Sequence, residues 1–197
     1  DGDYKLVNQG ASIRFGVPFS EVDTVFFGIG LERYAFDAQS SFAFLTPKSY
    51  RDYFQCKTDA SGLFVSRCDQ DSVWGVPLTI GWGRDNRDSA LVPTSGRLQR
   101  ASLELGAGGD MKYLKTSYQY QQFFPINKQY TFAINGEVGY GKAFGGKTFP
   151  IFKNFYAGGL GSIRGFEQNS LGPRDAPLLT QTEGAALGGT KKAIFNA

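Results

Sequence analysis

Residues Thr24 to Phe36 read TVFFGIGLERYAF, and this stretch decides the fold class. Every second residue is apolar, which gives the set Val25, Phe27, Ile29 and Leu31. Between them lie Phe26, Gly28, Gly30 and Glu32. Side chains of a β-strand point alternately to the two faces of a sheet, whereas those of a helix repeat every 3.6 residues. The stretch therefore predicts a β-strand with one apolar face.

The same alternation recurs along the chain. Further strands are predicted at 10–19, 73–83, 100–107, 113–123 and 130–140, and a seventh begins near Lys191. They run to about ten residues, longer than the ~5–6 of globular strands and close to the ~9–11 of a tilted transmembrane strand. Aromatic residues gather at the ends of the apolar faces, as in Trp74, Trp82, Tyr130 and Tyr140. These features favour a transmembrane barrel over a soluble β-sandwich or a lipocalin-like barrel, both of which the alternation alone also fits.

Composition agrees with a strongly curved sheet protein. The 197 residues include 26 Gly, 18 Phe and 10 Tyr, with no His. A net charge of +3, carried by scattered basic residues, gives no reason to expect nucleic acid as a partner. No apolar run approaches the ~18 residues of a membrane helix. The first ten residues lack the basic start and apolar segment of a signal peptide.

Seven strands do not close a barrel of this type. Bacterial single-chain barrels have an even number of strands, and an open edge in lipid leaves backbone groups unpaired at several kcal/mol each. We therefore expect an antiparallel transmembrane β-barrel fragment, all-β in class, that belongs to a longer protein.

The links between strands differ in length. Short links at 19–23 and 124–128 alternate with long loops at about 37–71 and 142–188, so we expect the long loops outside the cell and the short turns in the periplasm. Two links depart from this pattern. The link at 106–110 is short where a long one is expected, and the link at 84–96 is long where a turn is expected.

The stretch GKAFGGKT, from Gly141 to Thr148, matches the pattern of a phosphate-binding loop. That loop needs a helix directly after it, whose N-terminus faces the phosphates. Pro150 follows two residues after Thr148, and no helical pattern comes next. We therefore expect no nucleotide.

The two cysteines, Cys56 and Cys68, lie among polar residues of the first long loop. With two thiols and no His, a zinc site lacks ligands. A disulfide formed in an oxidising compartment explains the pair better than a redox-catalytic site. No metal, cofactor or catalytic residue is predicted.

The second long loop contains NFYAGGLGSIRGFEQNSLGPRD, Asn154 to Asp175. Its Ile163, Arg164, Gly165 and Phe166 resemble the Val/Ile-Arg-Gly-Phe/Tyr motif of the BamA family of outer-membrane protein insertases. The flanks GGKTFPIFKNFYAGG and LGGTKKAIFNA are also similar, as is GWGRDNRDSALVPTSGRLQRASLELG upstream. The resemblance covers essentially the whole chain.

The resemblance implies a multi-pass barrel of about sixteen strands in the outer membrane of Gram-negative bacteria, with about seven strands in residues 1–197. The link at 84–96 then corresponds to a periplasmic turn of the family. The POTRA domains and the seam between first and last strands are expected outside these residues. The implied function is non-enzymatic folding and insertion of β-barrel proteins. Implied partners are outer-membrane lipid, unfolded β-barrel clients and accessory outer-membrane lipoproteins.

An alternative within the same superfamily is a two-partner secretion pore or a TamA-type translocation factor, which shares the Arg-Gly-Phe/Tyr loop. The number of upstream POTRA domains would separate these possibilities.

The resemblance also assigns a role to Arg164, that of a structural latch holding the loop inside the barrel. A guanidinium can clamp carboxylates or carbonyls bidentately, and Phe166 would serve as an apolar anchor. Supporting glycines that let the backbone turn tightly are Gly158, Gly159 and Gly161. In the family the partner of this arginine lies on strands beyond Ala197; within the chain the possible lumen partners are Glu32, Glu104 and Glu137. The alternative is a solvated loop arginine.

Overall fold

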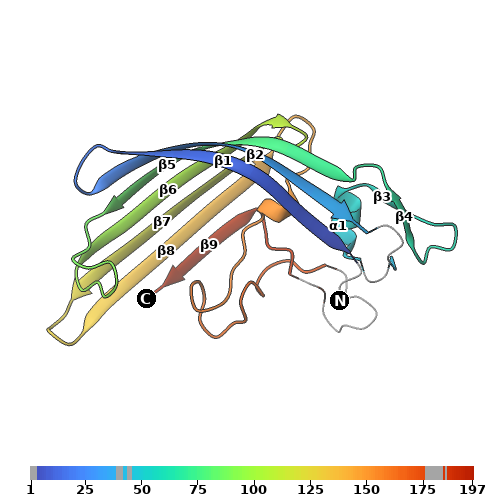
Figure 1. Cartoon of the computed structure of the whole chain (residues 1–197). Helices are drawn as coiled ribbons and strands as arrows, with labels where there is room; N and C mark the ends of the chain where they lie inside the picture. Colours follow the sequence, from blue (N-terminus) through green and yellow to red (C-terminus); the bar gives the residue numbers. More distant parts are fainter. Residues whose placement is uncertain (1–3, 39–41, 44–45, 176–183, 185) are drawn as a thin grey trace.

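The computed structural model describes residues 4–38, 42–43, 46–175, 184 and 186–197. The parts of the two predicted long loops at 39–41, 44–45, 176–183 and 185 lie outside the described residues. A single antiparallel sheet of seven strands arches across the molecule like part of a barrel wall (Figure 1). Its strands are β1 (Lys5–Pro18), β2 (Asp23–Asp37), β5 (Ser72–Asp85), β6 (Gly96–Gly109), β7 (Tyr113–Pro125), β8 (Thr131–Ala143) and β9 (Lys191–Asn196). Their order in the sheet is their order in the chain, as in an up-and-down barrel.

The sheet confirms the predicted fold class and the seven predicted strands. Most strands extend beyond the alternating stretch: β1 begins at Lys5 rather than Gly10, and β6 spans Gly96–Gly109 rather than 100–107. Backbone pairing continues where the apolar alternation stops, because the strand ends leave the apolar band and no longer need an apolar face.

Strand register places the apolar faces on one side of the sheet. One cross-strand row runs through Phe15, Phe27, Ile80 and Leu103. These side chains are open to the surroundings; Phe15 is 63% exposed and Ile80 51%. A contiguous apolar face of this size on the convex side is the surface that a lipid bilayer covers.

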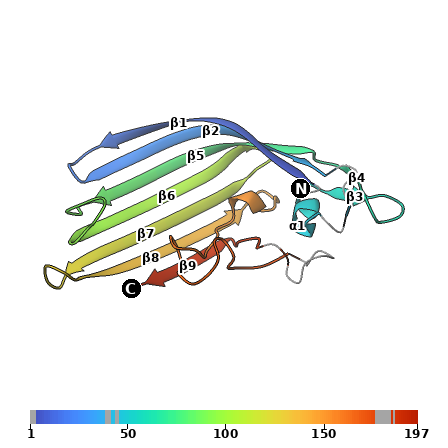
Figure 2. The same cartoon turned by 60° about the horizontal axis from the view of Figure 1, so that its bottom comes forward.

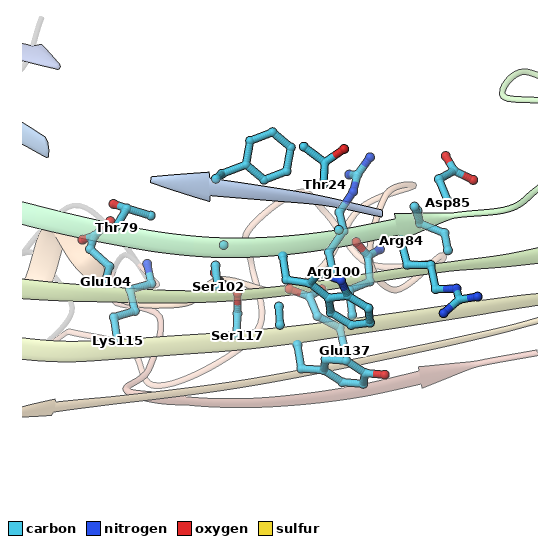
Figure 3. A pocket seen from close by; sticks show the side chains of 18 of the residues that line it. Thr24, Thr79, Arg84, Asp85, Arg100, Ser102, Glu104, Lys115, Ser117 and Glu137 are labelled. Carbon is cyan, nitrogen blue, oxygen red and sulfur yellow. Dashed lines mark hydrogen bonds between the residues drawn. The ribbon is translucent and has the colours of Figure 1, made fainter. Parts of the chain in front are cut away.

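The opposite, concave side is the inner face, and it carries polar residues and glycines. One inner row pairs Gly28 with Thr79, Thr79 with Glu104, and Glu104 with Lys115. A hollow along this face is lined by side chains from β1, β2 and β5 to β8 (Figure 3). This polar face suits a water-filled lumen.

The buried core lies at one end of the sheet. There the chain between β2 and β5 forms α1 (Lys48–Tyr53) and a hairpin of β3 (Cys56–Thr58) and β4 (Val65–Cys68). We call residues 46–71 the outer lobe. Its buried side chains pack against the inner face in a cluster that includes Phe36, Phe54, Val65, Val73, Met111, Tyr113 and Phe149. Among the described residues, no helix is long and apolar enough to cross a membrane.

The two predicted exceptions in link length are real. The link between β6 and β7 is a tight turn at the end of the sheet that holds the outer lobe, while the β5–β6 link is long and lies at the opposite end (Figure 1). The long link is ordered by its own hydrogen bonds: the Asp88 carboxylate accepts the backbone N–H groups of Thr94, at 2.9 Å, and Ser95, at 3.1 Å.

Candidate functional site: the lumen loop and its anchors

We call the chain between β8 and β9, residues 144–190, the lumen loop; its described residues, 144–175, 184 and 186–190, return across the inner face of the sheet. Figure 2 shows this segment, orange to red-brown, beneath the sheet beside β8 and β9. Its first turn uses positive φ angles at Gly145 (65°) and Gly146 (72°), where glycine is favoured. Pro150 and a three-residue 3₁₀ turn, η1 (Ile151–Lys153), follow. The stretch that matched a phosphate-binding loop thus leads into a short 3₁₀ turn rather than an α-helix.

Two aromatic rings of the lumen loop lie on glycines of β8. A Cβ atom added to Gly141 would stand 2.6 Å from the Phe149 ring, and one added to Gly139 would stand 2.7 Å from the Phe155 ring. Both separations are too short for real atoms, so any side chain there would displace the rings. We call Gly139 and Gly141 the glycine seats, because the two rings of the loop pack directly on them.

Lys153 joins the loop to the wall through three strands. Its Nζ lies 2.7 Å from Glu32 Oε2 on β2 and 3.1 Å from Glu104 Oε1 on β6. Its carbonyl oxygen accepts a 2.8 Å hydrogen bond from Lys115 Nζ on β7. The neighbouring Phe152 stacks on Tyr34, with ring centroids 3.7 Å apart. Figure 3 shows Glu104 and Lys115 beside each other on the inner face.

The Lys153 side chain is 11% exposed, and its ammonium remains charged. Burial lowers its pKa, but the hydrogen bond to Glu32 and the nearby charge of Glu104 raise it, and the net result is a pKa above the ordinary lysine value. Each carboxylate also accepts a phenol hydroxyl: Tyr113 donates to Glu104, and Tyr34 donates to Glu32 at 3.3 Å. The cluster is therefore neutralised and hydrogen-bonded, as a buried ion pair requires.

A second set of contacts comes from β9. Lys192 Nζ lies 2.6 Å from Glu137 Oε1 and donates to the carbonyl oxygen of Tyr156 at 3.4 Å. The Asn196 side chain donates to the carbonyl oxygen of Ser162 at 2.8 Å. These bonds fix the middle of the lumen loop, just before the Ile-Arg-Gly-Phe motif.

The motif itself lies at a turn of the loop. Gly158, Gly159 and Gly165 have φ of 109°, 93° and 86°, so the predicted glycine requirement has a backbone cause at Gly158 and Gly159 and within the motif. Gly161 has no positive φ, and a Cβ there would meet nothing within 4 Å. The Gly159 N–H donates to the Phe166 carbonyl oxygen at 3.1 Å, which closes the turn.

Arg164 is exposed, and Phe166 is 53% exposed. Among the described residues, no hydrogen bond or ion pair reaches the Arg164 guanidinium. The three glutamates expected as possible partners are held by lysines instead: Glu32 and Glu104 by Lys153, and Glu137 by Lys192. The Phe152 stack and the β8–β9 ladder place the two lysines next to these carboxylates. A latch partner beyond Ala197 stays a prediction.

The whole chain, residues 1–197, matches the model of the Omp85 superfamily domain. The chain belongs to the Omp85 superfamily. It is 37% identical over 199 residues to the outer membrane protein assembly factor BamA of Neisseria meningitidis, covering 98% of this chain and 23% of that protein. BamA of Nitratidesulfovibrio vulgaris is 27% identical over 199 residues, covering 98% of this chain and 22% of that protein.

A crystal structure of BamA from Haemophilus ducreyi that lacks POTRA domains 1–3 superposes with a TM-score of 0.76 at 25% identity. The match covers 95% of this chain and 36% of that one. The chain thus spans about a quarter of the length of the curated relatives it matches. As an Omp85 barrel segment it is part of an outer-membrane β-barrel, and its convex apolar face is the lipid-facing side.

The structure joins Cys56 to Cys68 in a disulfide that links β3 to β4 in the outer lobe of this Omp85 segment. Both strands are short, and Val65 and Cys68 are buried while Lys57 and Arg67 are exposed. Among the described residues, no group of three or more His, Cys, Asp or Glu side chains is placed to hold a metal ion.

Sequence reasoning missed Lys153 and Lys192 as site residues. Alternation along the strands did predict that the three glutamates face the lumen. The structure places Lys192 on the inner face, where it pairs with Gly139. For Lys153 the sequence offered one weak signal, its place directly before the NFYAGG flank of the Omp85 loop.

Proposed function

We propose that this chain forms the middle of the barrel wall of an outer-membrane protein insertase, which folds β-barrel clients and inserts them into the outer membrane. The observation that carries the proposal is the lumen loop with Ile163 to Phe166, anchored on the inner face of a chain 37% identical to BamA. We further propose that residues 1–197 are part of one barrel domain of about sixteen strands, with POTRA domains elsewhere in the protein.

In this proposal the barrel wall acts as a rigid scaffold and catalyses no covalent reaction. A client strand entering a bilayer gains by pairing its backbone groups and by burying its apolar face in lipid. An insertase that offers a template and a locally disturbed bilayer therefore needs no nucleotide, metal or catalytic residue. Its partners would be outer-membrane lipid, unfolded clients and accessory outer-membrane lipoproteins.

The function is tested with the complete protein in liposomes, to which a urea-unfolded β-barrel client is added without any nucleotide. The folded client is recognised by its resistance to heat denaturation in gel electrophoresis. We expect client folding to be faster than in empty liposomes. Equal rates would contradict the insertase proposal.

A second candidate is a secretion or translocation pore of the same superfamily. The polar inner face, with exposed Arg14 and Arg100, would also suit a water-filled passage. Liposomes that release a trapped soluble polypeptide through the protein, while client folding stays at the rate of empty liposomes, would favour the pore.

Sidedness is tested separately with single cysteines in intact cells. Leu63, 51% exposed in the outer lobe, is expected to react with a membrane-impermeant maleimide after Leu63→Cys. Leu91, 92% exposed in the β5–β6 link, is expected to react after Leu91→Cys only once the outer membrane is permeabilised. The native cysteines are joined in a disulfide and give no background. The reverse labelling pattern would invert the topology.

A further inference from the structure

Lys153 contacts strands that are not neighbours. β5 lies between β2, which carries Glu32, and β6, which carries Glu104. The Lys153 ammonium bridges these two carboxylates, and its carbonyl group is held by Lys115 of the next strand, β7. A single loop residue is therefore fixed by its side chain and its main chain to β2, β6 and β7, three strands of a four-strand span.

The charges of this cluster balance only when Lys153 is in place. Glu32 and Glu104 carry two negative charges, and Lys153 and Lys115 carry two positive ones. The side chains of Glu32 and Glu104 are 27% and 26% exposed, so water screens them only partly. Removing the Lys153 charge would leave two carboxylates facing one another with one cation for the pair, which is costly in a partly dry site.

The contacts to β9 are separate from this cluster. Lys192 and Asn196 bind the carbonyl oxygens of Tyr156 and Ser162, further along the loop. They share no residue with the Lys153 cluster. The base of the loop and its middle are thus attached to different parts of the wall.

We propose that Lys153 is an independent anchor for the base of the lumen loop, and that it positions this base whether or not Arg164 holds the motif. The anchor is an ionic clamp on Glu32 and Glu104. This inference goes beyond the proposed function and concerns where the loop lies, so it can be tested on purified protein without any assay of client insertion.

Backbone amides report the two regions separately. In the base, the N–H groups of Lys153, Asn154 and Phe155 donate to Pro150, Ile151 and Gly189. In the motif turn, the N–H groups of Gly159 and Ser162 donate to Phe166 and Gly159. Hydrogen exchange followed by mass spectrometry on the complete protein in lipid nanodiscs can measure both sets.

The test variant is Lys153→Met, which keeps an unbranched side chain and removes the charge. We expect exchange of the base amides to become at least about tenfold faster, since losing even one of the two charge-assisted bonds has about that effect, with the motif turn unchanged. The matched control is Lys147→Met, in the same loop, where the lysine is exposed and no ion pair is broken. We expect no change from this control.

A second variant separates the clamp from ordinary packing. Adding Glu104→Gln to Lys153→Met removes the carboxylate repulsion, so we expect the base amides to regain part of their protection. A purely steric role for Lys153 predicts no recovery. Unchanged base amides in Lys153→Met, equal acceleration of base and motif turn, or absence of recovery in the double variant would each overturn the proposal.

Discussion

The two long loops at the same end of the sheet are stabilised in different ways. The outer lobe packs its apolar side chains into the buried cluster at this end of the wall, where Phe54 is 0% and Val65 1% exposed, and a disulfide closes its hairpin. In the lumen loop, the described tip exposes Leu160 at 90% and Phe166 at 53%, and its order comes from ion pairs, hydrogen bonds and glycine seats on the wall. Apolar burial and a cross-link thus stabilise the outer lobe, whereas polar contacts to the wall stabilise most of the lumen loop.

The two loops nevertheless touch. Tyr53 of α1 meets the edge of Phe152, with ring centroids 5.6 Å apart, and the Ser49 N–H donates to the Asp175 carboxylate at 3.1 Å. Phe149 of the lumen loop also belongs to the buried cluster of the outer lobe, but the Lys153 ion pairs and the β9 contacts of the lumen loop lie outside that cluster. We therefore expect the outer lobe and the lumen loop to unfold separately, and variants in each can show whether they do.

The largest effect is expected from Phe54→Ala. Phe54 is fully buried and stacks on Phe36, with ring centroids 4.9 Å apart. Emptying this site should cost about 3–5 kcal/mol of local stability, from lost apolar burial and the cavity left behind. Protease digestion of the protein in nanodiscs should cut the outer lobe rapidly while the lumen loop stays intact. Equal loss of protection in both loops would show that they form one cooperative unit.

The disulfide is expected to matter less, and only within the outer lobe. Cys56 and Cys68 are separated by 12 positions, so their cross-link removes unfolded-state entropy worth at most about 3 kcal/mol. Replacing both with Ser should loosen the β3–β4 hairpin while the barrel still inserts and resists heat denaturation. Thiol titration of the unreduced protein checks the pairing, and two free thiols would contradict it.

The difference between the regular strands and the irregular lumen loop explains which parts of the structure could be predicted from the sequence. Period-two alternation predicted the strands, because one face of each strand contacts lipid and the other faces the lumen. The same alternation placed Glu32, Glu104 and Glu137 in the lumen. It could not say which cation meets them, since Lys153 lies 121 positions after Glu32 and nothing local to either residue encodes the contact. The resemblance directed attention to Arg164, and the structure pairs these carboxylates with lysines.

The glycine seats were missed for a related reason. Gly139 and Gly141 appear in the alternation simply as small residues on the polar face. Their function depends on Phe149 and Phe155, which come from an irregular segment without a period. Alternation along the strands thus predicts the barrel wall. The contacts between the loop and the wall can be identified only in the folded structure.

Arg164→Ala is expected to have the next largest effect. The latch predicted from the resemblance would contribute about 1.5–3 kcal/mol through a charge-assisted hydrogen bond, enough to hold a loop but not a barrel. In the complete protein we expect an inserted barrel with a mobile motif turn and slower client assembly, while the Lys153 base keeps its protection. Arg164→Lys should restore only part of the motif-turn protection and of the client assembly rate, because an ammonium cannot make a bidentate contact. Wild-type exchange in the motif turn together with normal client assembly would exclude the latch.

The smallest effect is expected from Gly139→Ala, which tests a seat rather than an ion pair. The added methyl would stand 2.7 Å from the Phe155 ring, so the ring must move and the loop with it. Because Phe155 belongs to a loop and not to a strand, the strain can relax, and we expect about 1 kcal/mol, at the low end for overpacking. The readout is faster exchange of the Phe155 N–H, which donates to Gly189 at 2.8 Å.

The same strand supplies the control for this seat. A Cβ added to Gly136 would meet nothing within 4 Å. Gly136→Ala therefore measures the effect of an alanine in β8 that does not touch the loop. We expect its exchange pattern to match the wild type. Combining Gly139→Ala with Phe155→Leu shortens the group above the seat and should recover part of the protection. If Gly136→Ala and Gly139→Ala behave alike, the loop does not depend on the glycine seats, and the ionic clamp at Lys153 is left to hold the base.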